Sequence, residues 1–290
     1  MNMKKCKVRR RVFGIVGEMM LFLASITLCL PVLLTVFASL KSGWELKEYL
    51  LPILSENGEK AKWFLGPAYP TLSHFRKLLF ETPQFFVVFW NSVKMVFLIL
   101  CGQIAVAIPA GWAFARFNFR GKKILLLIYI ILMLMPFQVT MLPSYLVIDF
   151  LGLLNTQMSV VLPAIFSTFP VFVVYRGFMM IPQEIIEAAQ VDGAGDMSVL
   201  LRIGIPLGMP GILSAFVLGF LEYWNMMEQP LAFLKDKTLW PLSLYLPEID
   251  SGQAGIALAA SVVILIPAVF VFLFGQDYME QGIISSGIKE

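Results

Sequence analysis

The stretch IPQEIIEAAQVDGAG (residues 181–195) is a polar interruption between two long apolar segments. Pro182 suits the first turn of a helix. Gly193 permits the left-handed turn that commonly ends one. Glu187 lies between these two signals, on a polar side of the segment. The pattern therefore predicts a short exposed helix over residues 182–195.

This predicted helix has one small apolar face. The face consists of residues at helical spacing, Ile181, Ile185, Ala188 and Ala189. A helix of this length is not stable alone in water, so it needs a surface to pack on. Interfacial helices prefer Lys and Arg on their polar face, whereas this helix carries glutamates. We therefore expect a protein partner with a hydrophobic cleft and a basic rim.

The composition around this stretch is that of a membrane protein. The 290 residues are 59% hydrophobic and 14% charged, with a mean hydropathy of +0.81, whereas soluble domains are about 45–50% apolar and about 25% charged. The apolar runs are continuous and do not alternate, which favours helices over a barrel. We expect an all-α integral membrane protein with six spans, at 14–39, 85–113, 124–147, 157–180, 205–225 and 254–275.

The distribution of Lys and Arg predicts the orientation of these spans. The opening MNMKKCKVRRR and the link 114–123 are basic, whereas the link 148–156 carries only Asp149. Both termini and the segment 181–204 are therefore expected in the cytoplasm. The predicted organisation is a basic tail (1–12), a first transmembrane helix (13–40), an extracellular segment (41–84), a membrane core (85–280) that contains the helix 182–195, and a cytoplasmic tail (281–290).

The chain lacks the residue patterns of an enzyme. His74, the one histidine, has no metal-ligand spacing around it and is interpreted as a surface residue. Neither a nucleophile-elbow motif nor a phosphate-binding loop with its glycine spacing is present. We therefore assign no catalytic residue and no metal ligand, and ATP, if used, must bind to another chain.

Polar residues inside the apolar runs are candidates for a translocation path, because such residues in a membrane often line a cavity. The candidates are Asn91, Lys94, Gln138 and Asn225. Buried amides, Gln103 included, also serve to hold helices together, and that interpretation stays open. The aromatic residues Phe220, Tyr223 and Trp224 are candidates to line the passage, and a lipid-facing or packing position is the alternative for them.

The segment EAAQVDGAGDMSVLLRIGIP resembles the cytoplasmic signature of ATP-binding-cassette importer permeases, in which Glu-Ala-Ala, three residues, Gly, nine residues and Ile-x-Leu-Pro follow one another. Ile205 stands where leucine is usual. The positions in register are Glu187, Ala188, Ala189, Gly193, Ile203 and Pro206. From about residue 60 onward, stretches such as AGWAFARFNFRGKK and YWNMMEQPLAFL are similar to the maltose-type carbohydrate permeases, specifically the smaller partner of a permease pair.

This resemblance implies a fold, a location and partners. The chain would be one of two permease subunits in a bacterial plasma membrane, served by two cytoplasmic ATPase subunits and an extracellular solute-binding protein. The helix 182–195 would be the coupling helix, with Glu187 resembling the glutamate that pairs with an ATPase arginine. ATPase closure would then switch the permease between inward- and outward-facing states and move a sugar or oligosaccharide.

Three other functions were weighed against this one. An ion-coupled secondary carrier would place carboxylates in mid-membrane. A lipid-modifying enzyme would need paired acids, for which only Glu222 and Glu228 offer themselves. The same type of importer could also carry a solute that is not a sugar.

Overall fold

A computed structural model describes residues 2–54, 66–245 and 253–287, and the side chains of residues 17–49, 66–245 and 253–279. All regular structure in these residues is helical. The chain forms two compact units. Unit 1 comprises Met1–Thr82 and Leu246–Val263, and unit 2 comprises Pro83–Tyr245 and Ile264–Glu290. Each unit is described by itself.

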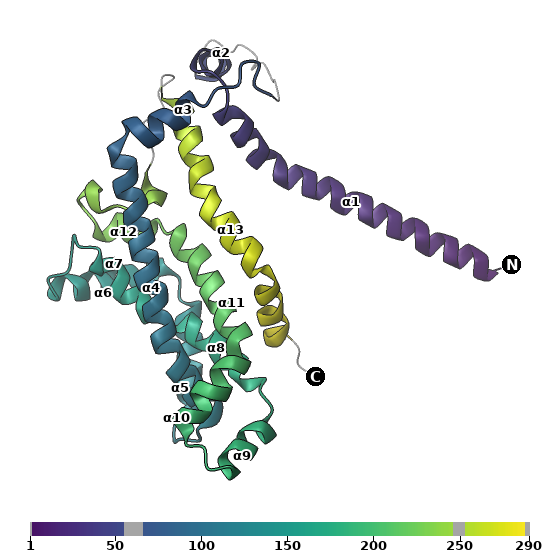
Figure 1. Cartoon of the computed structure of the whole chain (residues 1–290), viewed down its shortest axis with the longest axis vertical. Helices are drawn as coiled ribbons and strands as arrows, with labels where there is room; N and C mark the ends of the chain where they lie inside the picture. Colours follow the sequence, from purple (N-terminus) through teal and green to yellow (C-terminus); the bar gives the residue numbers. More distant parts are fainter. Residues whose placement is uncertain (1, 55–65, 246–252, 288–290) are drawn as a thin grey trace. The chain divides into compact units, whose positions relative to one another are not determined.

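The helices follow one another in a simple order (Figure 1). Unit 1 contains α1 (Asn2–Ser39), α2 (Gly43–Leu54), α3 (Ser73–Arg76), the π-helical turn η1 (Lys77–Glu81) and the first part of α13 (Ala254–Gly287). Unit 2 contains α4 (Pro83–Arg116), α5 (Lys122–Leu134), α6 (Phe137–Phe150), α7 (Met158–Ile165), α8 (Thr168–Met179), α9 (Gln183–Val191), α10 (Asp196–Val199), the π-helical turn η2 (Leu200–Gly204), α11 (Ile205–Trp224), α12 (Glu228–Phe233), the short turns η3 (Lys237–Leu239) and η4 (Leu242–Leu244), and the rest of α13.

The prediction of a helical membrane protein is confirmed. Among the described residues, five segments are long and apolar enough to cross a bilayer, and a bent pair of helices brings the number to six. The five are Gly17–Ser39, Pro83–Arg116, Met158–Met179, Asp196–Trp224 and Ala254–Met279. The cytoplasmic location of the termini stays a prediction. The backbone of α1 is helical from Asn2 and that of α13 to Gly287, so helix covers most of the two expected tails.

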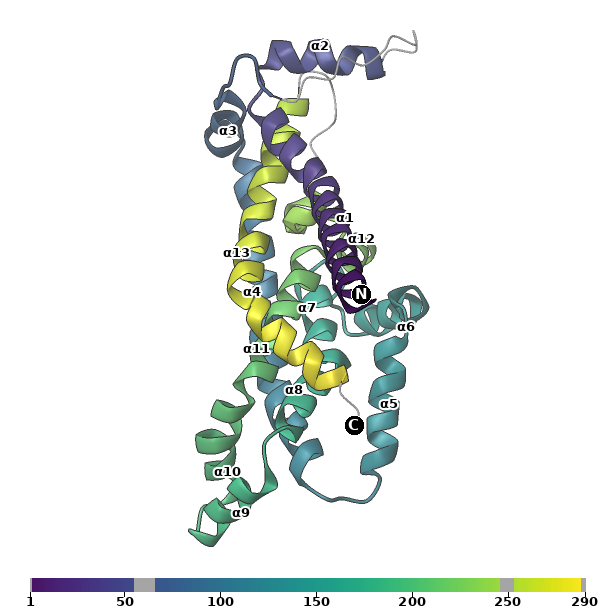
Figure 2. The ribbon, with the colours of Figure 1, turned by 90° about the vertical axis from the view of Figure 1, so that its right-hand side faces the viewer.

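The third expected span, 124–147, is wrong as a single helix. It consists of α5 and α6, whose axes meet at 102°. Met135, between them, has an extended backbone (φ −74°, ψ 122°). The cause is Pro136, which disfavours the helical conformation of the residue before it and cannot donate a backbone hydrogen bond. Figure 2 shows α6 turned away from the direction of α5.

Helices α4, α8 and α11 form the core of unit 2. The ring of Trp112 on α4 meets that of Phe178 on α8 edge to face, with centroids 5.2 Å apart. The backbones of α8 and α11 touch, since a Cβ added to Gly177 would lie 2.9 Å from the Cα of Gly211. Small residues permit this close approach, as in many membrane helix pairs.

His74 is a buried residue of unit 1, so its interpretation as a surface histidine is wrong. Its side chain is 6% exposed, and its Nε2 donates to the Lys41 carbonyl at 3.1 Å. A Cβ added to Gly255 would lie 2.3 Å from the imidazole. The ring therefore occupies space that a glycine on α13 leaves open. Burial lowers the pKa of His74 below its ordinary 6.5.

Candidate functional sites: the exposed helix α9 and a polar cavity

The predicted short helix is present as α9, and its helical part ends at Val191. Gly193 follows in the left-handed region with φ +84°. Its N–H donates to the carbonyl of Gln190, and the N–H of Ala194 donates to that of Ala189, both at 3.0 Å. This pair of bonds is the Schellman arrangement, which satisfies the last carbonyls of the helix. Gly193 is therefore required by backbone geometry.

One face of α9 packs on the core of unit 2. Ile186, Ala189 and the preceding Ile181 are buried in the cluster around Trp112. The predicted apolar face is correct for Ile181 and Ala189 and wrong for Ile185 and Ala188, which are exposed. Successive residues of a helix point about 100° apart, so Ile185 and Ile186 cannot both face the core, and the structure selects Ile186.

The opposite face of α9 is open to the surroundings. Ile185 is 41% exposed and Val191 is 87% exposed. The side chains of Glu184, Glu187 and Ala188 are exposed beside them. Within the described part of the chain, Glu187 forms no hydrogen bond or ion pair. The helix thus presents apolar and acidic groups together on a face that no described residue covers.

An arginine holds the start of α9 in place. Arg116, at the end of α4, donates from Nη2 to the carbonyls of Phe178 and Ile181, both at 2.7 Å. Its Nη1 donates to Oε1 of Gln183, the first residue of α9, at 2.9 Å. Its guanidinium lies 5.6 Å from the ring centre of Trp112. These contacts tie α4 to the link between α8 and α9.

The rest of the signature lies after α9. Ile203, in η2, is half-buried and packs against the same core cluster as Ala189. Pro206 is the second residue of α11 and is exposed, as are Glu187 and Gly193. The signature therefore divides into residues that fix the loop against unit 2 and residues that remain accessible. Figure 1 shows α9 and α10 together at the end of the unit where α11 begins.

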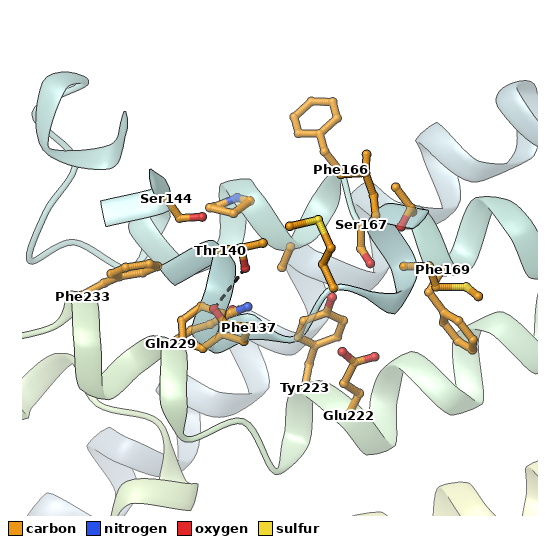
Figure 3. Close-up of a pocket in the computed structure, with 16 residues that line it drawn as sticks. Phe137, Thr140, Ser144, Phe166, Ser167, Phe169, Glu222, Tyr223, Gln229 and Phe233 are labelled. Carbon is orange, nitrogen blue, oxygen red and sulfur yellow. Dashed lines mark hydrogen bonds between the residues drawn. The ribbon is translucent and has the colours of Figure 1, made fainter. Parts of the chain in front are cut away.

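A cavity of about 510 Å³ opens at the breaks in the helices of unit 2 (Figure 3). The α5–α6 bend and the gap between α7 and α8 supply most of its wall, and the end of α11 and α12 supply the rest. Aromatic side chains occupy several sides, namely Phe137, Phe166, Phe169 and Phe233. Its polar side chains are Thr140, Ser144, Ser167, Thr168, Glu222, Tyr223 and Gln229.

Hydrogen bonds fix part of this wall. Gln103 on α4 donates from Nε2 to the Ala164 carbonyl at 2.8 Å and to the Tyr223 hydroxyl at 3.0 Å. These bonds support the interhelical role for Gln103, and they hold Tyr223 at the cavity. Oε1 of Gln229 is buried and has no hydrogen-bond partner among the described residues.

Residues 107–285 match the family described as "Binding-protein-dependent transport system inner membrane component". This match covers more than half of the chain and includes both α9 and the cavity. The chain belongs to this family. It is a multi-pass permease of the bacterial plasma membrane, and the resemblance to importer permeases is confirmed.

The permease is also similar to individual proteins. It is 29% identical over 226 residues to the arabinooligosaccharides transport system permease protein AraQ of Halalkalibacterium halodurans, with 77% of this chain and 81% of AraQ covered. It is 28% identical over 211 residues to the sn-glycerol-3-phosphate transport system permease protein UgpE of Yersinia enterocolitica, with 71% and 75% covered.

The fold of the permease matches a solved structure. That structure is a bacterial ABC transporter involved in the import of the acidic polysaccharide alginate. The TM-score is 0.77 at 21% identity, and the match covers 92% of this chain and 96% of the other. At this identity the likeness establishes the architecture alone.

The four candidate path residues of the permease do not meet in one place. Asn91 is buried and its Nδ2 donates to the carbonyls of Thr238 and Trp240 at 2.7 and 3.1 Å. Gln138 donates to Oε1 of Glu228 at 2.8 Å, beside a second hollow of about 490 Å³.

The other two candidates, Lys94 and Asn225, are exposed, and neither is among the residues that line the 510 Å³ cavity. Asn225 donates to the carbonyl of Leu221, one turn earlier, at 2.9 Å. None of the four candidates lies on the wall of the polar cavity.

Two features of the permease were missed at the level of sequence. In the sequence, Arg116 serves only as a topology signal, and Glu222 is interpreted as an ionisable group near the end of an apolar segment or as an acid for lipid chemistry. The sequence shows that Arg116 lies at the end of an apolar segment. It does not show which carbonyls its side chain binds. The signal for Glu222 is an acidic residue within the apolar span Asp196–Trp224.

Proposed function

We propose that this permease moves a sugar or oligosaccharide through an ATP-binding-cassette importer and that α9 is its coupling helix. The complex would contain a second permease, two ATPase subunits that bind the ATP, and an extracellular solute-binding protein. Closure of the ATPases would displace α9 and switch the permease between its two access states. Family membership supports the dependence on a binding protein.

The observation that carries this proposal is the uncovered face of α9. Water is a poor environment for Ile185 and Val191, and anionic headgroups are a poor environment for Glu184 and Glu187. A protein cleft with an apolar floor and a basic rim satisfies both kinds of group. An ATPase arginine near Glu187 would form a charge-assisted pair, which is lost at a cost of several kcal/mol when one partner is removed.

The choice of a saccharide is supported by relatives and by the cavity. AraQ is named for arabinooligosaccharides, and the cavity of this chain combines phenylalanine rings with hydroxyl and amide groups. Rings of this kind stack on the apolar faces of sugars while polar groups meet the hydroxyls. UgpE is named for sn-glycerol-3-phosphate. A solute that is not a sugar therefore remains the alternative.

The coupling role is tested by reversing charge on α9. Glu187→Arg should leave membrane insertion intact, reduce co-purification of the ATPase and lower uptake at least tenfold, because it places like charges together. Gly193→Asp should act similarly by straining the left-handed turn. Asp149→Arg, an exposed acid at the end of α6, is the matched control. Normal ATPase binding and uptake in both α9 variants would rule out the proposed role.

A further inference from the structure

The polar cavity has an unusual charge composition. Of the 16 described residues that line it, Glu222 is the one that carries a full charge, and no Lys or Arg accompanies it. Figure 3 shows its carboxylate below Tyr223, on the cavity side of α11. The neighbouring hollow contains a further acid, Glu228. The described residues that line the two hollows include no Lys or Arg that could neutralise either acid.

The N-terminal end of α8 acts in the opposite direction. It begins at Thr168 on the cavity wall, and the N-terminus of a helix is equivalent to about half a positive charge. Pro170, in the first turn, has no N–H to add to this end. The N-termini of α6 and α12 also lie at the wall, but the C-termini of α5, α7 and α11 lie there too and carry partial charges of the opposite sign. The helix ends therefore offset one another, and the Glu222 carboxylate keeps the potential in the cavity negative. An anionic solute would be repelled.

The acceptors of the cavity also specify what a ligand must donate. The carboxylate of Glu222, on the cavity wall, accepts hydrogen bonds only. Carboxylate and phosphate groups of a ligand are acceptors as well, so they would leave its oxygens unsatisfied. Sugar hydroxyl groups are donors and would satisfy them. Phe137, Phe166 and Phe169 offer rings for the apolar side of the same ligand.

We propose that this cavity binds a saccharide without carboxylate or phosphate groups, and that Glu222 is the residue that sets this charge preference. The inference rests on the proposed transport function and narrows its substrate class. The proposed solute therefore differs from those named for two similar proteins, which are an acidic polysaccharide and a phosphate ester.

The charge preference can be measured without knowing the solute. Ser167→Cys and Thr140→Cys place a thiol on two sides of the cavity, in a full-length chain whose Cys6, Cys29 and Cys101 are changed to serine. The thiols are labelled in membranes of cells that express the importer. The two probes are the cationic 2-aminoethyl and the anionic 2-sulfonatoethyl methanethiosulfonates. Each rate is divided by the rate for a free thiol in solution.

The cationic probe should react about tenfold faster than the anionic one, because the carboxylate attracts the first and repels the second. Glu222→Gln should bring this ratio close to about one, whereas Glu222→Asp should preserve most of it. Asp277→Asn on α13, an exposed acid that does not line the cavity, is the matched control and should leave the ratio unchanged. An equal ratio in the parent and in Glu222→Gln, or faster labelling by the anionic probe, would overturn the proposal.

This measurement is independent of the coupling role. Labelling of the cavity does not require ATPase docking, so a preserved ratio with normal uptake in Glu187→Arg would reject the coupling role alone. If the cationic and anionic probes label the parent cavity at equal rates while Glu187→Arg abolishes uptake, the charge preference alone is rejected.

Discussion

Nη2 of Arg116 lies 2.7 Å from the carbonyl oxygen of Ile181, across 65 residues of sequence. The same nitrogen reaches the Phe178 carbonyl, so one side chain satisfies two acceptors at the end of α8. Carbonyls at a helix end lack partners within the helix. Arg116 therefore determines both how α8 ends and the direction in which the chain enters α9.

Replacing Arg116 should loosen α9 without removing it. Arg116→Ala should lower the free energy of unfolding by about 2 kcal/mol, because charge-assisted hydrogen bonds are lost and the Ile181 carbonyl loses its donor, while the Phe178 carbonyl keeps the N–H of Ile181. It should also weaken ATPase co-purification, and Arg116→Lys should restore only part of the binding, since an ammonium cannot form the same fork. Thermal unfolding in detergent and pull-down of the ATPase measure the two effects. Arg120→Ala is the control, and equal behaviour of the two alanine variants would contradict the role of Arg116.

The close contact between Gly177 and Gly211 predicts that a larger residue at either position destabilises the protein. An added Cβ on either glycine would lie 2.9 or 2.8 Å from the Cα of the other, which is closer than such atoms approach. Gly177→Ala and Gly211→Ala should each destabilise unit 2 by about 1–3 kcal/mol through overpacking. Gly195→Ala has open space around its Cβ and should unfold at the parent temperature. Parent-like unfolding of all three variants would show that α8 and α11 are further apart.

Replacing Asn91 can distinguish a role in holding the fold together from a role in lining the translocation path. Its side-chain amide donates to the carbonyls of Thr238, in η3, and of Trp240, just after η3, and its Oδ1 accepts a hydrogen bond from Gln157 at 2.8 Å. Asn91→Ala should cost about 2–3 kcal/mol of stability, because buried polar groups lose their partners. Lys94→Ala, one turn away and exposed, should not change stability. Loss of uptake in Asn91→Ala at full stability would instead favour a place on the translocation path.

His74 predicts a pH dependence in unit 1. Burial lowers its pKa, and Lys77 nearby acts in the same direction, while the hydrogen bond to the Lys41 carbonyl opposes them. The unfolded chain thus takes up a proton at a higher pH than the folded chain. The stability contribution is complete above about pH 6.5 and is lost as the pH falls below it.

The matching experiment compares thermal unfolding at about pH 7.5 and about pH 5, on either side of the ordinary pKa of histidine. The unfolding temperature of the parent should fall more between these conditions than that of His74→Gln, which keeps a donor but does not titrate. Identical falls in the two proteins would show that His74 does not contribute.

Much of the architecture could be predicted because its causes are local. Continuous apolar runs require helices in a membrane, and Pro182 and Gly193 mark the ends of α9 from their own backbone preferences. The rotation of α9 could not be predicted in the same way. It depends on contacts with Trp112 and Arg116, far away in the sequence, and so the choice between Ile185 and Ile186 was made incorrectly.

The candidate sites also divide into a part with local causes and a part that depends on distant contacts. Glu187 and Gly193 follow from a contiguous signature, whereas the cavity forms only when residues between Leu132 and Phe233 come together at two helix breaks. Pro136 is one of 17 prolines in the sequence, and its local preferences do not specify the 102° angle between α5 and α6. His74 was placed at the surface because the space left by Gly255 arises from tertiary packing.

Neither arm of the elbow at Met135 and Pro136 can traverse a bilayer. At 1.5 Å per residue, helices of 13 and 14 residues reach about 20 Å each, against a hydrocarbon thickness of about 30 Å. At the corner, the Met135 N–H donates to the Leu132 carbonyl and the Val139 N–H to the Pro136 carbonyl, at 3.2 and 3.1 Å, so these peptide groups find partners within the chain. The two short helices can therefore act as one crossing only as a pair, and the break between them is also where Met135 and Phe137 meet the polar cavity.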